Sequence, residues 1–430
     1  MQQTSIQRIR TIDAIRGVAV LGILIINFQD MAFPEDLVLA FHATDPDKGS
    51  NYWFGIISEI FIAGKFRGIF TLIFGVSSSI IYVKITENTQ GNTVVGIYFY
   101  RLLWLLVFGL VNAYLFLWWG DVLIKYAILG VLLFAFQRAP FWILTATALT
   151  CLAVLTIQPA AEYRELVNLQ QKSNDAQYKQ QSGQLLTPSD LNNLEQWKEA
   201  LEDIQPRTDS IERESQIKTG SFIGLFRYNL HSAFEEQTYI FYKEDVWDML
   251  LFMILGIMLF RLGFFNERRK QILHLTTAFF GVGIGLVIHS WMILGIYENP
   301  LDPVRLQFFL IFSNLGRLPF VVGYLSLIIL VFRPGIFRPI GDWMVAVGRM
   351  ALSNYLISSI IGAFVFYGFG LALFNQLNRL QVLFVIIVVW IGQVVFSVIW
   401  IKRFHYGPFE WLWRSLTYFK AQPLWRRVCK

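Results

Sequence analysis

The sequence predicts an all-α integral membrane protein, a polytopic bundle of about ten transmembrane helices with a polar extracytoplasmic insert. Hydrophobic residues make up 55% of the chain and charged residues only 15%, whereas soluble proteins carry about 25% charged residues. The apolar residues gather in runs of roughly 20 residues, the length that crosses a hydrocarbon core. Lys and Arg lie in short loops between these runs, which indicates a partner in the lipid bilayer and not in nucleic acid.

The apolar runs place the predicted helices along the chain. In order they are 14–33, 66–84, 98–118, 121–137, 140–158, 246–263, 272–297, 306–332, 340–367 and 381–401. The stretch 52–64 predicts a short interfacial or re-entrant helix before the second crossing. Basic residues near the helix ends put both termini in the cytoplasm, and the acidic loops then fall outside.

Four regions follow from this pattern. They are an N-terminal membrane half (1–158), an extracytoplasmic insert (159–245), a C-terminal membrane half (246–401) and a cytoplasmic basic-aromatic tail (402–430). The last part of the insert, 221–245, is aromatic and amphipathic, so we expect it to lie on the outer membrane surface. The tail is typical of an interfacial helix on the acidic inner leaflet.

Metal and disulfide chemistry are not predicted. The five histidines are scattered along the chain, so we expect no dedicated metal site. The two cysteines, Cys151 and Cys429, lie in an apolar run and at the basic C-terminus. We therefore predict no disulfide.

Polar and ionisable side chains inside apolar runs form a first group of candidate site residues. Arg101, Arg317 and Arg349 fall within or at the edge of such runs. A charge facing lipid is costly, so we expect each to point into the bundle, a water-filled cavity or an interface. Asn354 follows Arg349 closely and either lines the same cavity or pairs within the bundle. His289 is either hydrogen-bonded structure or a secondary member of a polar site.

Charged residues at helix ends form a second group. Asp13 and Arg16 share a helix face, which is typical of an N-terminal ion pair. Lys65 and Arg67 lie on the outer side by this topology, against the positive-inside trend, so we expect one of them to line a polar site. Asp121 follows a tight outer turn and either N-caps the next helix or serves in a functional site.

Three stretches carry a resemblance to a known family. They are IDAIRGVAVLGILIIN with GKFRGIFTLIFG; LLWLLVFGLVNAYLFLWWGDVLIKYAILG; and GRMALSNYLISS with FYGFGLALF and IKRFHYGPFEWLWRSLTY. They resemble the YeiB family of bacterial membrane proteins, catalogued as domain of unknown function number 418. The resemblance covers nearly the whole chain except the polar insert, and it implies a multi-pass protein of the bacterial inner membrane.

The first helix is also similar, more distantly, to that of transmembrane acyltransferases such as heparan-glucosaminide acetyltransferase and the OafA-type O-antigen acetylases. That similarity implies an acyl group taken from cytosolic acyl-CoA and an extracytoplasmic acceptor. It also implies catalytic roles for Asn27, near the outer end of the first helix, and for His42 in the following loop. Asn27 would donate to the thioester carbonyl or its oxyanion, and His42 would act as general base or accept the acyl group. The alternatives without a catalytic role are that the Asn27 amide is hydrated or hydrogen-bonds a neighbouring helix, and that His42 is an exposed loop histidine.

Phosphates of the CoA nucleotide need cationic partners, and Arg binds phosphate bidentately. The residues expected to bind acyl-CoA are Arg16, Lys65, Arg67 and Arg101. Two other functions remain open: a transporter or flippase of a small molecule or lipid, and a non-catalytic membrane scaffold. An acyltransferase requires a polar passage, a transporter requires a midplane site, and a scaffold requires a filled bundle. The acyl donor, the acceptor and the oligomeric state stay open.

Overall fold

Helices make up nearly all the regular structure that a computed structural model describes for residues 10–39, 49–88, 92–266, 270–332 and 338–426. The first third of the chain forms α1 (Arg10–Ala32), α2 (Glu35–Leu39), α4 (Ser50–Phe61), α5 (Lys65–Asn88), α6 (Asn92–Leu110), the π-helix η1 (Val111–Leu115) and α7 (Leu123–Phe136). The middle forms α8 (Phe141–Gln181), α9 (Pro188–Asp203), α10 (Thr208–Thr219), α11 (Phe222–Glu235), the π-helix η2 (Glu236–Asp245) and α12 (Val246–Arg261). The last part forms α13 (Gln271–Glu298), α14 (Pro303–Leu310), α15 (Ser313–Val331), α16 (Arg338–Arg349), α17 (Ala351–Phe366), α18 (Arg379–Arg403) and α19 (Pro408–Thr417).

Long apolar helices confirm a helical, multi-pass membrane architecture. In the described part of the chain, seven helices are long and apolar enough to cross a membrane, or up to eight if the bent pair α16–α17 makes one crossing. Six of the seven include α1, α6, α8, α13, α15 or α18, and the seventh joins α4 to α5. The helix α7 is apolar but shorter. The predicted number of ten crossings stays a prediction.

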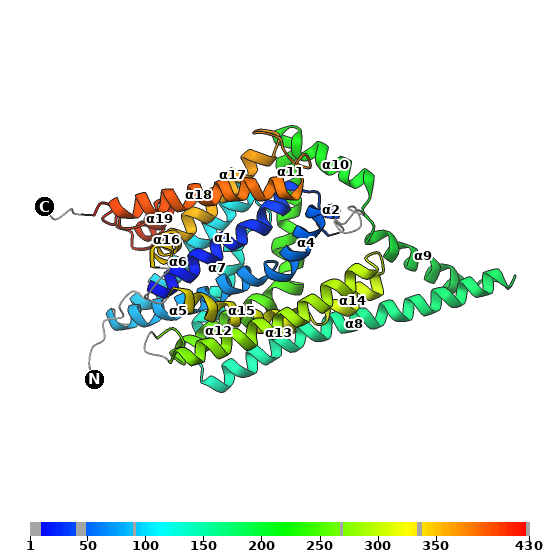
Figure 1. The fold of residues 1–430 in the computed structure, drawn as a ribbon, viewed down its shortest axis with the longest axis horizontal. Helices are drawn as coiled ribbons and strands as arrows, with labels where there is room; N and C mark the ends of the chain where they lie inside the picture. Colours follow the sequence, from blue (N-terminus) through cyan, green and yellow to red (C-terminus); the bar gives the residue numbers. More distant parts are fainter. Residues whose placement is uncertain (1–9, 40–48, 89–91, 267–269, 333–337, 427–430) are drawn as a thin grey trace.

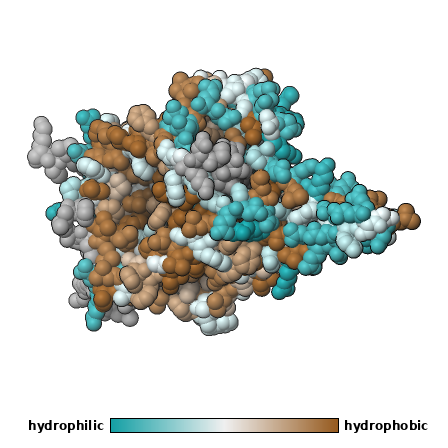
Figure 2. Space-filling view, turned by 45° about the vertical axis from the view of Figure 1, so that its right-hand side comes forward, coloured by the Kyte–Doolittle hydropathy of each residue, from teal (hydrophilic) through white to brown (hydrophobic). Residues whose placement is uncertain are grey.

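The bundle has two ends that differ in chemistry. α1 begins and α18 ends at the end drawn on the left in Figure 1, which we call the terminus side. The polar helices α9 and α10 lie at the opposite end, which we call the arm side. Figure 2 shows an apolar surface over the body of the bundle and a hydrophilic surface over the projecting arm. This division is typical of a protein whose body contacts lipid and whose arm contacts water.

The helix α8 does not end where its apolar part ends. It runs from Phe141 through Pro159 to Gln181, far beyond the predicted helix 140–158, and α9 returns beside it (Figure 1). Ala, Glu, Leu, Gln and Lys dominate its second half, and these are strong helix formers. The change in composition at residue 158 therefore marks a change of surroundings and not a helix end.

The stretch 221–245 also differs from the prediction that it lies on the outer membrane surface. It forms α11 and η2, which continue without a break into α12. Glu236, Phe241 and Asp245 are buried within it, so its second half enters the bundle instead of lying on the membrane surface. Extra backbone bonds of the π type mark irregular helical geometry, which occurs often at functional positions.

Helix α1 lies against α5, α16, α17 and α18. It approaches α16 so closely that a side chain at Gly17 or Gly348 would meet the facing backbone. Small residues allow such crossings in membrane bundles. The helices α16 and α17 meet at Met350 with a bend of 78°. This bend brings Arg349 close to the start of α1 and helps to form the pocket described next.

Candidate functional site

A deep pocket enters the bundle from the terminus side, with a volume of about 410 Å³. Its walls are α1, α5, α6, the start of α7, the α16–α17 bend and α19. Lys84 and Tyr418 are exposed at the mouth, and Tyr126 is buried at the inner end. Pockets of this size commonly hold small-molecule ligands.

The pocket reaches far along the bundle axis. Its lining on α5 runs from Lys84 at the mouth to Phe70 near the inner end. These residues are roughly four helical turns apart, which corresponds to about 21 Å of helix rise. A hydrocarbon core is about 30 Å thick. A ligand that fills the pocket would therefore extend well past the middle of the bundle.

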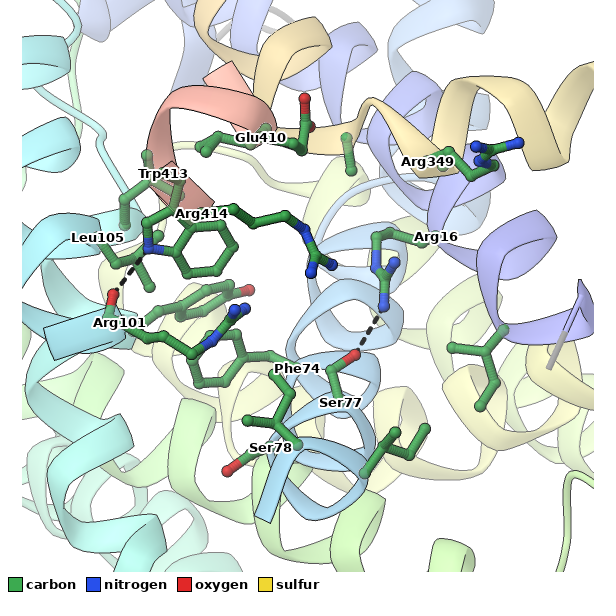
Figure 3. A pocket seen from close by; sticks show the side chains of 18 of the residues that line it. Arg16, Phe74, Ser77, Ser78, Arg101, Leu105, Arg349, Glu410, Trp413 and Arg414 are labelled. Carbon is green, nitrogen blue, oxygen red and sulfur yellow. Dashed lines mark hydrogen bonds between the residues drawn. The ribbon is translucent and has the colours of Figure 1, made fainter. Parts of the chain in front are cut away.

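Three of the four arginines that line this pocket come from distant parts of the chain and point into it. Arg16 comes from α1, Arg101 from α6 and Arg414 from α19, and Figure 3 shows their guanidinium groups pointing toward the middle of the pocket. The Arg16 guanidinium donates to Asp13 at 3.1 Å and to the Ser77 hydroxyl at 2.7 Å. The ion pair predicted between Asp13 and Arg16 is thus present, and it lies in the wall of the pocket.

The other two arginines of this group are held by aromatic rings. Arg101 lies 4.3 Å from the Trp413 ring centroid and Arg414 lies 4.6 Å from the Tyr406 ring centroid. Neither forms an ion pair with an acidic residue of the described ranges. Arg101 is only 8% exposed. A buried cation without a counter-ion is costly, so this pair of arginines favours an anionic ligand.

Glu410 is the other acidic residue that lines the pocket besides Asp13. Its carboxylate accepts bonds from the backbone nitrogen of Ser353 at 3.0 Å and from the Ser353 hydroxyl at 2.5 Å. Burial raises the pKa of Glu410 above its usual range. The positive charge of the pocket is poorly compensated, because five cationic side chains line it against these two acids.

The inner end of the pocket is apolar and aromatic. Phe70, Phe74, Leu105, Leu123 and Leu352 contribute to its walls. Burying an apolar chain there is favourable in proportion to the area removed from water. The pocket thus joins a cationic region to an apolar inner end, which suits an amphiphilic anion.

Two tyrosines connect this inner end to polar groups behind it. The Tyr126 hydroxyl lies 2.7 Å from the Thr71 hydroxyl, and Thr71 donates to the Arg67 carbonyl at 2.8 Å. The Tyr355 hydroxyl donates to Asp121 Oδ2 at 3.3 Å. Polar contacts therefore continue from the pocket toward the arm side.

Asp121 combines a cap with these contacts. Its Oδ1 accepts the backbone N–H of Ile124 at 3.0 Å, which is a capping contact made from one residue before the N-cap of α7, Val122. Its Oδ2 accepts the Asn112 amide at 2.7 Å and the Tyr355 hydroxyl. Burial raises the pKa of Asp121 to about 7.

A second polar cluster lies toward the arm side and is electrically balanced. We call it the ion-pair network; it consists of Arg67, Lys125 and Arg317 with Glu236, Asp245 and Asp248. Lys125 Nζ contacts Glu236 at 2.5 Å and also Asp245, while Arg67 lies 3.2 Å from both aspartates. Arg317 pairs with Asp248. Three cations thus meet three anions, which join α5, α7, η2, α12 and α15.

The predicted site residues fall into separate places. Arg16, Arg101, Asp13 and Arg349 line the pocket, and Arg349 donates to the His405 carbonyl at 2.9 Å. Arg67 and Arg317 belong to the ion-pair network instead. Lys65 lies outside the pocket. Its side chain is buried, with 2% exposure, and donates to the Glu59 carbonyl at 2.6 Å.

The remaining predicted residues lie away from the pocket. Asn27 is half-buried near the arm-side end of α1, and its side chain makes no hydrogen bond to the described residues. His42 lies outside the described residues. His289 Nδ1 lies 3.0 Å from the Gly285 carbonyl. Asn354 donates to the Ser397 hydroxyl at 3.0 Å and to the Val347 carbonyl at 3.2 Å, which is the structural pairing weighed for it.

Several site residues escaped prediction. The sequence predicts Trp413 and Arg414 on the membrane surface, because basic and aromatic residues in a tail are typical of an interfacial helix. Lys125 offered a usable signal, a lone lysine within VLIKYAILG. Its partners Glu236 and Asp245 lie more than a hundred residues further along the chain, so no local pattern connects them.

These features define a class: a helical multi-pass membrane protein with a basic, amphiphilic pocket. Residues 259–420 match the family model described as a protein of unknown function, DUF418. Two uncharacterised proteins match over nearly their whole lengths. YxaH of Bacillus subtilis (strain 168) is 27% identical over 98% of this chain and 97% of its own, and YeiB of Escherichia coli (strain K12) is 28% identical over 96% and 97%.

An uncharacterised 39.9 kDa protein from the amylase 3′ region of Bacillus acidopullulyticus is 22% identical over 97% of this chain and 96% of its own. No solved structure matches the chain significantly. The C-terminal part of the chain thus matches the DUF418 family model, and nearly the whole chain is similar to YxaH and YeiB.

Proposed function

We propose that the protein is a transmembrane acyltransferase that takes an acyl group from acyl-CoA in the pocket and delivers it to an arm-side acceptor. One observation carries this proposal: arginines without acidic partners point into a deep pocket whose inner end is apolar. Acyl-CoA has the matching division, with phosphates at one end and an acyl chain at the other. Guanidinium groups bind phosphates through charge-assisted hydrogen bonds.

The proposal includes an orientation. The terminus side is the cytoplasm of a bacterial inner membrane, where acyl-CoA is made, and the arm side is extracytoplasmic. Basic residues near the terminus-side helix ends, such as Lys402 and Arg403, support this orientation. The proposal takes α1, α5, α6, α7, α8, α12, α13, α15, α17 and α18 as the ten crossings that the sequence predicts.

The residues then take different roles. Arg16, Arg101 and Arg414 bind the phosphates, and the pocket interior receives the thioester and the acyl chain. Asn27 and His42 come from the arm-side end of α1 and the loop after it, where they would contact the acceptor. The ion-pair network fixes the helices around the inner end of the pocket.

A transporter or flippase of a phosphate-bearing small molecule or lipid is the second candidate. The ion-pair network favours it, because buried ionisable residues on several helices are typical of substrate and ion pathways. A filled, non-catalytic scaffold is disfavoured, because a pocket of about 410 Å³ is present.

Thermal unfolding of the detergent-purified protein tests the acyltransferase. We expect acetyl-CoA, longer acyl-CoAs and free CoA to raise the unfolding temperature, since a ligand at a hundred times its Kd adds about 2.7 kcal/mol. Arg101→Ala and Arg414→Ala should remove most of the shift. Arg164→Ala, on the exposed part of α8, is the matched control and should keep it.

The outcomes separate the two candidates. Stabilisation by acyl-CoA together with CoA release supports acyl transfer. Stabilisation without CoA release, combined with uptake of a labelled phosphate ester into proteoliposomes, supports transport. No shift with any CoA species at millimolar concentration overturns the acyltransferase.

A further inference from the structure

An unusual turn closes the arm side of the pocket's inner end. It connects η1 to α7 and carries Asp121, which is 0% exposed. Leu117 in the same turn has a φ of 60°, a left-handed conformation that a branched side chain rarely adopts. Such strain persists only where the surroundings hold it, and it is found often at functional sites.

The helix before this turn is irregular as well. η1 is a π-helix, and π-bulges occur frequently at functional sites. It presents Asn112, which is 0% exposed and donates to Asp121 at 2.7 Å. The Asn112 Oδ1 has no hydrogen-bond partner within the described ranges. A buried acceptor without a donor is uncommon and needs an explanation, such as a ligand or a water molecule.

Tyr355 stands between this turn and the pocket. It lines the pocket, is 5% exposed and donates to Asp121 Oδ2 at 3.3 Å. The backbone N–H of Val122 donates to the same hydroxyl at 3.3 Å. The hydroxyl therefore has a donor behind it and a carboxylate beside it, which is the arrangement that a proton relay needs.

We propose, on the basis of the function proposed above, that Tyr355 and Asp121 form the proton relay for acyl transfer at the inner end of the pocket. Tyr355 is the group that touches the reacting atoms. Asp121 acts through Tyr355 by holding the proton, and Asn112 orients Asp121. This pair takes the role that the sequence resemblance gives to His42.

A hydroxyl or amine acceptor attacks the thioester carbonyl carbon, so a bond forms between the acceptor atom and that carbon. The acceptor proton moves to the Tyr355 oxygen while the Tyr355 proton moves to Asp121. The carbon–sulfur bond then breaks, and the proton returns through Tyr355 to the sulfur. The products are the acylated acceptor and CoA, with both side chains restored.

The neighbouring groups allow Asp121 to exchange a proton. No cation within the described ranges forms an ion pair with Asp121, and on η2 the Gln237 amide donates to its backbone carbonyl at 3.3 Å. On α7 the nearby Lys125 is neutralised by Glu236 and Asp245, and Tyr126 bonds Thr71. Burial raises the pKa of Asp121 to about 7, which suits an acid–base group near neutral pH.

Acetyl-CoA with hydroxylamine as a surrogate acceptor tests the relay in proteoliposomes of the full chain. CoA release is followed with a thiol reagent, and CoA binding is followed by thermal unfolding. Tyr355→Phe and Asp121→Asn should keep CoA-induced stabilisation and lose about 100-fold or more in rate. Tyr324→Phe removes a hydroxyl that bonds the Phe61 carbonyl outside the pocket, and it is the matched control.

A second readout does not depend on turnover. Infrared titration of the wild type should show a carboxylic acid band that changes near neutral pH, shifts in Tyr355→Phe and is absent in Asp121→Asn. A missing band overturns the relay, and so does a wild-type rate in Tyr355→Phe, above all if His42→Ala abolishes CoA release. No stabilisation of the wild type by CoA defeats the proposed function itself, which is a different result.

Discussion

The pocket and the ion-pair network both contain cationic side chains, but they differ in whether these cations have acidic partners. In the pocket, Arg101 and Arg414 face aromatic rings and lack acidic partners among the described residues. In the network, every cation contacts a carboxylate. The same residue type therefore serves two purposes, and its partners distinguish them.

This difference indicates that a ligand binds in the pocket and not in the ion-pair network. In the ion-pair network every charged group already has a partner of opposite charge, so none is available for a ligand. Removing one partner leaves a buried charge uncompensated. In the pocket, positive charge exceeds negative charge, so the binding of an anion there is electrostatically favourable. Substitutions of arginine should therefore mainly reduce stability in one region and ligand affinity in the other.

The largest effect is expected in the network. Asp245→Ala deprives both Lys125 and Arg67 of a carboxylate. Removing one partner of a buried pair typically costs about 3–5 kcal/mol, so the unfolding temperature should fall sharply. Equilibrium or thermal unfolding in detergent measures it. A loss below about 1 kcal/mol would show that the network is hydrated and weak.

The next largest effect is on ligand affinity. Arg101→Ala should weaken CoA binding by roughly tenfold to a hundredfold, since hydrogen bonds to charged groups contribute about 1.5–3 kcal/mol. Its unliganded stability should fall less than that of Asp245→Ala. Titration calorimetry with CoA measures the affinity, with Arg101→Lys as a variant that keeps the charge. Equal affinities of the wild type and Arg101→Ala would remove Arg101 from the ligand site.

A pH-dependent effect is expected at Asp121, between the two regions. Its pKa is raised from 3.8 to about 7 in the folded protein, so the folded state binds the proton more tightly than the unfolded state. The resulting stabilisation is complete below the unfolded pKa and is lost as the pH rises through about 7. Unfolding temperatures of the wild type and Asp121→Asn should therefore diverge over this window. Parallel pH profiles would contradict the raised pKa.

The smallest effect is expected on the arm. Lys198 and Glu202 form an exposed pair at 3.4 Å on α9, and such pairs contribute about 0.3–0.5 kcal/mol. Lys198→Ala should leave unfolding and CoA binding almost unchanged. A large loss of CoA affinity in this variant would show that the arm takes part in the donor site.

Sequence reasoning reached the helical membrane architecture because apolar run length alone decides it. It also selected Arg16 and Arg101 for a shared ligand, since an arginine in an apolar run must avoid lipid. The same reasoning placed Lys65 and Arg67 with that ligand, but neither lines the pocket. The aspartates that pair with Arg67 belong to a distant helix, and spacing along the chain cannot show such contacts.

Other features depend on geometry that no local pattern encodes. Arg414 lies in the pocket because α19 folds back against α6, where the Trp413 indole donates to the Arg101 carbonyl at 2.9 Å. In the sequence the same residues are those of an ordinary interfacial helix. The continuation of α8 past Pro159 has a simpler explanation: the apolar run ends where the surroundings change from lipid to water, and the helix itself does not end there.

Calorimetric titration with CoA, dephospho-CoA and pantetheine tests whether the arginines of the pocket bind the phosphates of acyl-CoA. If the arginines of the pocket bind the phosphates, CoA binds most tightly, dephospho-CoA less tightly and pantetheine most weakly. The affinity for CoA falls with added salt. In Arg414→Ala the differences in affinity between the three compounds become smaller. If all three compounds bind equally, or if none binds, the pocket is not a site for acyl-CoA.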